Sequence, residues 1–64
     1  MRLFTLIVHD PSEATPSVEL MTVRDRKRAL ELATRRLKES PWSERIEVWE
    51  GEVALFSVTR ADLV

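Results

Sequence analysis

The chain has 64 residues, a net charge of −1 at pH 7, a single histidine and no cysteine. This length indicates one small domain over residues 1–64. The absence of cysteine excludes disulfides and thiolate metal sites, and we expect no cofactor. No apolar run approaches the roughly 20 residues of a membrane span. The first apolar run is not followed by a cleavage pattern. We therefore expect a soluble, cytoplasmic protein with no membrane partner.

Two strands are predicted in the first part of the chain. Residues 1–8 (M-R-L-F-T-L-I-V) are almost continuously apolar, which is typical of a central strand covered on both faces. Residues 9–17 contain two prolines and two serines and are predicted to form a loop. Residues 18–23 (V-E-L-M-T-V) read as a second strand, with apolar side chains on both of its faces.

One helix is predicted, over residues 26–39. Asp25 is the expected N-cap, and a capping box from Thr22 to Asp25 is an alternative start one turn earlier. Pro41 disfavours helical geometry at Ser40, so the helix should end near Glu39.

The apolar stripe of this helix is narrow. At about 100° per residue, Leu32 lies off it and Arg26 flanks it. The residues expected to face the sheet are Ala29, Leu30, Ala33 and Leu37.

The last part of the chain reads as a hairpin. Residues 40–44 are a connector in which Trp42 is expected to fold back over the end of the helix. Residues 45–49 and 52–59 are predicted strands, with Glu50-Gly51 as the turn. Residues 60–64 are expected to form a short tail. With a two-residue turn, one face holds Trp49, Ala54, Phe56 and Val58 and the other holds Ile46, Val48, Val53 and Leu55; a longer turn would shift this register.

These elements predict an α+β domain with ββαββ order. We expect a four-stranded, mainly antiparallel sheet in which the first strand lies between the second and the third, with the fourth at the far edge. One helix is about 10–12 Å wide, whereas four strands span about 19 Å, and the second face has no helix to cover it. Large apolar side chains on both faces therefore predict a homodimer that buries the helix-free face or an edge strand. The candidate dimer surface is Phe4, Trp49 and Phe56.

The sequence contains little that resembles a catalytic motif. His9-Asp10 is the only histidine–carboxylate neighbour pair, and an ordinary loop or strand-end histidine explains it equally well. The single glycine excludes a glycine-rich phosphate loop. The two tryptophans are interpreted as core or interface residues, with base stacking as the alternative. A carboxylate cluster near the hairpin is interpreted as a solvated edge, because it lacks the spacing of a calcium loop; it comprises Glu44, Glu47, Glu50 and Glu52. We expect a non-enzyme.

Positive charge is concentrated on the helix. Residues 24–39 hold seven basic and three acidic residues, whereas the rest of the chain holds three basic and eight acidic ones. Arg26, Lys27 and Arg28 lie at the end where the helix dipole is already positive, and Arg24 and Arg28 form a like-charge pair. A solvated face relieved by neighbouring glutamates is one interpretation. The other is a surface for an anion or an acidic partner, formed by Arg24, Lys27, Arg28, Arg35 and Lys38.

Two segments carry a family resemblance. The A-L-x-x-A pattern of Ala29 to Ala33 and the I-E-V-W-E-G run of Ile46 to Gly51 resemble small uncharacterised bacterial proteins. Those proteins combine an A-L-x-x-A helix with a (V/I)-E-V-W-x-G hairpin. The resemblance implies a ββαββ fold and no activity. The chain departs from that pattern in the first helical turn, which tends to be acidic in the family but holds Arg26, Lys27 and Arg28 here.

The predicted function is a non-enzymatic, homodimeric interaction module that binds another protein. The alternative is a nucleic-acid- or phosphate-binding accessory protein that uses the basic face of the helix.

Overall fold

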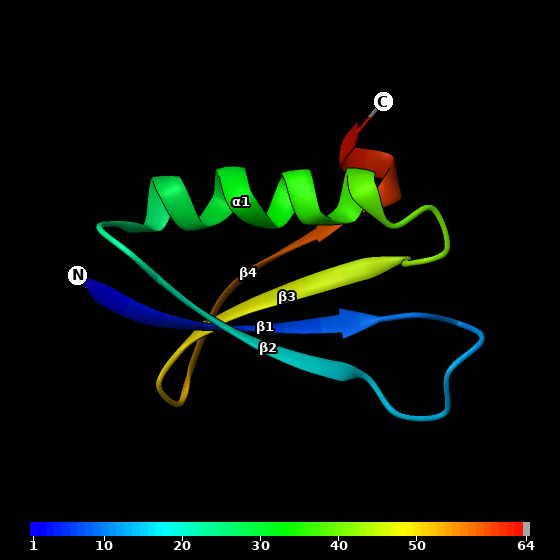
Figure 1. Cartoon of the computed structure of the whole chain (residues 1–64), viewed down its shortest axis with the longest axis horizontal. Coiled ribbons are helices and arrows are strands. Elements are labelled where there is room, and N and C mark those ends of the chain that lie inside the picture. The colour runs from blue at the N-terminus through cyan, green and yellow to red at the C-terminus, as the bar shows by residue number, and fades with distance from the viewer. Residues whose placement is uncertain (64) are drawn as a thin grey trace.

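The computed structural model describes residues 1–63, which form one sheet with one long helix across it (Figure 1). The predicted α+β ββαββ arrangement is confirmed, and every predicted strand boundary agrees to within one residue. Val64, the last residue of the predicted tail, lies outside the described residues. The elements are β1 (Arg2–His9), β2 (Ser17–Val23), α1 (Arg26–Glu39), β3 (Arg45–Glu50), β4 (Val53–Thr59) and the short 3₁₀ helix η1 (Arg60–Leu63).

The sheet has the order β2-β1-β3-β4, and each pair of neighbours is antiparallel. The predicted central position of β1 is confirmed. Because β2 and β3 both run antiparallel to β1 and lie on either side of it, α1 carries the chain across β1 (Figure 1). This crossing holds the helix against one face of the sheet.

The N-terminus of α1 is capped as predicted. The Asp25 side chain accepts a hydrogen bond from the backbone N–H of Arg28 at 2.8 Å. The Ala29 N–H bonds to the Asp25 carbonyl oxygen at 3.1 Å. The helix therefore begins at Arg26, and the alternative start at Thr22 is not adopted, since Thr22 lies in β2.

Arg60 of η1 occupies the C-terminal end of α1. Its guanidinium donates to the carbonyl oxygen of Ser43 at 2.9 Å and to the carbonyl oxygen of Ser40. Both carbonyls lie in the connector after α1, and the Ser40 carbonyl oxygen also accepts from the Ser43 N–H at 3.1 Å, so Arg60 links η1 to this connector. The expectation that Trp42 covers this end is wrong: Trp42 is 70% exposed because Arg60 takes the position instead.

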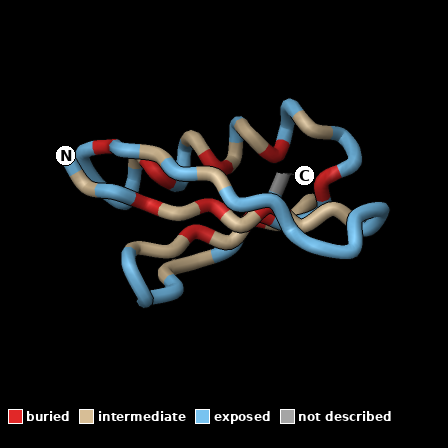
Figure 2. The backbone as a smooth tube through the Cα atoms, turned by 60° about the horizontal axis from the view of Figure 1, so that its bottom comes forward, coloured by how far each residue is buried: buried red, intermediate tan, exposed pale blue. Residues whose placement is uncertain are grey.

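The core lies between α1 and one face of the sheet (Figure 2). Alternate residues of β1 point into it, and Ala29 and Ala33 let the helix approach the strands closely. The ten buried apolar residues are Phe4, Leu6, Val8, Val23, Ala29, Ala33, Leu37, Ile46, Val48 and Val58.

The buried stripe of α1 is rotated from the predicted one. Leu30 is 43% exposed, whereas Leu32 packs against the core, so the prediction is wrong for these two residues. Arg36 lies one turn beyond Leu32 on the same side and holds Glu19 of β2 through both carboxylate oxygens, at 2.8 and 3.2 Å. The two hydrogen bonds of this pair link that side of α1 to β2.

The hairpin turn lies one residue later than predicted. Glu50 pairs with Val53, which leaves Gly51 and Glu52 as a two-residue loop. Gly51 has a φ of 61°, whereas Glu52 has a negative φ. Glycine at the first loop position with only one positive φ corresponds to a type II′ turn.

A β-bulge in β4 changes the face on which its later residues lie. Trp49 pairs with Ala54 but Val48 pairs with Phe56, so Leu55 is the extra residue. One extra residue reverses the alternation along the strand. Trp49 and Ala54 therefore share a face as predicted, whereas Phe56 and Val58 lie on the helix side, contrary to the prediction.

Candidate functional site

The face of the sheet away from α1 has no covering element among residues 1–63. We call it the outer face. Three of its apolar side chains are more than half exposed: Leu3 at 55%, Val18 at 64% and Leu20 at 67%. Cross-strand pairs of Leu20 with Thr5 and of Thr5 with Trp49 form one row across β2, β1 and β3, and Val18 pairs with Ile7 in the next row. The apolar residues of the outer face are Leu3, Ile7, Val18, Leu20, Trp49 and Ala54.

Of the three residues predicted to form the dimer surface, only Trp49 lies on the outer face. Phe4 is 0% exposed and packs beneath the helix, so its assignment to a dimer surface is wrong. Phe56 pairs with Val48 and packs against the core, so it also belongs to the helix side. Sequence reasoning missed Leu3, Val18 and Leu20, because the alternation of Leu3 with Phe4 does not show which of the two lies beneath the helix.

His9 forms a polar cluster at one end of the outer face. Its Nε2 lies 2.6 Å from Oε2 of Glu47, and the carboxylate accepts this hydrogen bond when Nε2 carries the proton. Arg45 Nη2 lies 3.4 Å from the same nitrogen and is a donor only. The cluster orients His9 through Glu47 on β3, not through the neighbouring Asp10, which bonds Ser12 instead.

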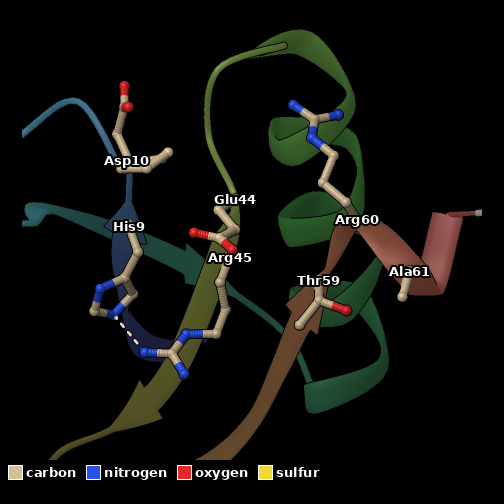
Figure 3. Close-up of a pocket in the computed structure, with 8 residues that line it drawn as sticks. His9, Asp10, Glu44, Arg45, Thr59, Arg60 and Ala61 are labelled. Atoms are coloured by element: carbon tan, nitrogen blue, oxygen red, sulfur yellow. Dashed lines mark hydrogen bonds between the residues drawn. The ribbon is translucent and has the colours of Figure 1, made fainter.

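A pocket of about 680 Å³ lies beside this cluster (Figure 3). Its walls carry two acidic groups, Asp10 and Glu44, and two arginines, so opposite charges balance. The Arg60 side chain turns away from His9 toward the connector carbonyls (Figure 3). Its lining residues are His9, Asp10, Pro11, Glu44, Arg45, Thr59, Arg60 and Ala61.

The four carboxylates near the hairpin do not meet. Glu44 lines the pocket, Glu47 bonds His9, and Glu50 bonds Arg2 of β1. Glu52 is exposed in the turn. Within residues 1–63, no three histidine or carboxylate side chains gather as metal ligands.

The predicted basic residues form a line on the side of α1 away from the sheet, which we call the basic stripe. It consists of Arg24, Lys27, Arg28, Arg35 and Lys38. Four of the five are exposed, and Arg28 is partly exposed. The first turn of α1 holds no acidic residue, so the positive end of the dipole faces positive side chains. Each exposed charge so placed costs about 0.3–1 kcal/mol of stability.

Two ion pairs touch the basic stripe. Arg28 Nη1 donates to Glu31 Oε2 at 3.0 Å, and Arg24 Nε lies 4.0 Å from Asp25 Oδ2. Among the ion pairs that residues 1–63 form, none includes Lys27, Arg35 or Lys38. Arg36 differs from the stripe because it turns inward, where its hydrogen bonds to Glu19 raise its pKa.

None of the helices within residues 1–63 has the length and apolarity to span a membrane. Comparisons with protein-family models, curated proteins and solved structures find no match to the chain. The resemblance drawn from the helix and hairpin motifs therefore stays a prediction, and the functional argument depends on the geometry of the two surfaces.

Proposed function

We propose that the chain is a non-enzymatic, homodimeric interaction module whose two copies meet through the outer face. The observation that carries this proposal is the set of uncovered apolar side chains on β2, β1 and β3, in which Leu20 is 67% exposed. Exposed apolar patches of this kind on small domains are typical of interaction sites. An aligned packing of sheet on sheet, about 10 Å apart, would remove these side chains from water.

Charge favours a second copy as the occupant of this face. A two-fold interface places the same surface patch on both sides, so a charged patch would repel itself. The basic stripe and the carboxylate-rich hairpin each carry an excess of one charge, so neither would pair with its own copy. The outer face would not repel itself, because the charges of Arg45 and Glu47 cancel and its other members, apart from His9, are uncharged.

The size of the outer face favours a reversible dimer. Four strands at about 4.8 Å and seven residues at about 3.3 Å give a flat area of about 440 Å² per copy. Two copies then bury about 900 Å², close to the roughly 1,000 Å² at which specific interfaces begin. We therefore expect dissociation at low concentration rather than a permanent dimer.

The oligomeric state tests this proposal. Sedimentation velocity over a range of micromolar concentrations should show wild-type protein approaching twice the 7.4 kDa monomer mass. Leu20→Glu places a charge in the centre of the interface and should keep the chain monomeric. Leu30→Glu is the matched control, because Leu30 is an exposed leucine on the opposite side of the molecule. Circular dichroism checks that both variants remain folded.

A monomer at every concentration in the wild-type protein would refute the proposal. Equal loss of dimer in both variants would also refute it, since the effect would then not belong to the outer face.

A further inference from the structure

We propose that the basic stripe of α1 binds the sugar-phosphate backbone of a nucleic acid. This site is separate from the outer face and does not depend on dimer formation. The helix lies on one side of the sheet and the outer face on the other, so both surfaces are accessible at once (Figure 1).

The geometry of the stripe suits an extended ligand. Its helical members, Lys27, Arg28, Arg35 and Lys38, lie within about 100° of one another around the helix axis, and Arg24 precedes the N-cap. From Lys27 to Lys38 the stripe is about 17 Å long at 1.5 Å per residue. One nucleic-acid strand presents a phosphate about every 3.4 Å along a duplex axis, so this length spans about five phosphates.

Folding alone does not account for this arrangement. Asp25 already caps the helix through the Arg28 N–H, and the first turn contains no acidic side chain. Lys27 and Arg35 contact no carboxylate within residues 1–63. Arg36, which does stabilise the fold, turns inward to Glu19 instead. Among residues 1–63, Lys27, Arg35 and Lys38 therefore have no ion-pair partner and can meet an external anion.

A phosphate backbone fits better than an acidic protein. The cations of the stripe lie along about 17 Å of one helix face, so they can meet several phosphates of a polymer that carries one charge per repeat. Glu31 lies within it but is paired with Arg28, so it leaves an excess of positive charge. Many of the carboxylates of the chain lie elsewhere: on the β1–β2 loop, in the pocket and along the β3–β4 hairpin. They do not oppose a polyanion that approaches α1.

A salt titration tests this site. Fluorescence anisotropy of a labelled duplex DNA and of a single-stranded RNA should show binding at low salt. On the duplex, four to five contacts should give a log–log slope of about −4, because each contact contributes about −0.9. Arg35→Glu should weaken binding about tenfold or more at low salt and make the slope shallower. Arg45→Glu is the matched control: it changes the net charge equally, is exposed, and lies off the stripe.

Three results would overturn the proposal. The first is no binding of either nucleic acid at low salt. The second is an equal loss of binding affinity in Arg35→Glu and Arg45→Glu, which would mean that net charge alone explains the effect. The third is capture of a polyglutamate probe with an affinity equal to that for DNA, which would assign the stripe to acidic proteins. Leu20→Glu should bind DNA as wild type does, so failure of the dimer proposal is distinguishable from failure of this one.

Discussion

Arg2 of β1 and Glu50 at the end of β3 form a bidentate pair across the sheet. Arg2 Nε donates to Glu50 Oε2 at 2.6 Å, and Nη2 donates to Oε1. The Arg2 guanidinium also lies 5.5 Å from the centre of the Phe4 ring. The hydrogen bonds from Arg2 lower the pKa of Glu50, against the opposing effect of partial desolvation. The pair therefore links the start of the chain to the hairpin through a charge that depends on pH.

This pair predicts a loss of stability in acid. Because the pKa of Glu50 is lower in the folded state, its contribution is present above the unfolded value of about 4.3 and is lost as the pH falls through the folded value. Urea unfolding should show that Glu50→Gln is less stable than wild type at pH 7 and that the difference shrinks as the pH falls below the unfolded pKa. Glu52→Gln, on the same hairpin, is the control. A difference for Glu50→Gln that does not change with pH would contradict the prediction.

The rotation of α1 predicts unequal effects at two leucines. Leu37→Ala removes a side chain that is 0% exposed and should lower the free energy of unfolding by about 2–5 kcal/mol. Leu30→Ala should cost less than about 1 kcal/mol, because Leu30 is 43% exposed and alanine is the better helix former. Urea denaturation measures both. Equal costs would mean that the helix packs in the orientation predicted from its sequence.

The type II′ turn predicts a backbone effect at Gly51. A Cβ placed there meets no atom within 4 Å, so Gly51→Ala is penalised only by its φ of 61°. We expect a loss of about 1–2 kcal/mol in the free energy of unfolding. Glu52→Ala, where φ is already negative, should be nearly neutral. Thermal unfolding of the two variants separates them, and a neutral Gly51→Ala would argue against the turn geometry.

Substitutions at the N-cap residue Asp25 should separate the contribution of its charge to stability from that of its hydrogen bond. Asp25→Ala removes the acceptor for the Arg28 N–H and should cost about 0.5–2 kcal/mol. Asp25→Asn keeps an acceptor at the same position and should retain most of the stability. Chemical denaturation followed by circular dichroism reports both changes. If Asp25→Asn lost as much as Asp25→Ala, the charge rather than the cap would be the stabilising group.

The order of the strands could be predicted because apolar side chains occupy both faces of β1. A strand of that kind is most stable in the interior of a sheet. Asp25 and Pro41 likewise marked the two ends of α1. These signals are local: each depends on a few neighbouring residues and on backbone preferences that the tertiary structure did not override.

The face that α1 covers could not be predicted from the same pattern. Phe4 and Leu3 are both large and apolar, so alternation alone does not show which of them lies beneath the helix. The bulge at Leu55 arises from pairing between two strands rather than from either strand alone, and it moved Phe56 to the helix side. The rotation of α1 brings Arg36 to Glu19, which lie 17 residues apart, so it belongs to the tertiary structure rather than to the helix alone. Phe4 and Phe56 were therefore placed on the wrong face of the sheet, whereas the position of the basic stripe needed only helical periodicity.

The central place of β1 also has a consequence for how the chain folds during synthesis. The first strand to leave the ribosome needs β3 as its second neighbour, and His9 and Glu47 are 38 residues apart in the chain. Until β3 emerges, β1 has only β2 to pair with, and a two-stranded hairpin is marginally stable in water. For most of the time in which the domain is synthesised, β1, its most apolar strand, therefore has both faces exposed. Nascent chains stalled before β3 should therefore depend on chaperones more than chains stalled after it.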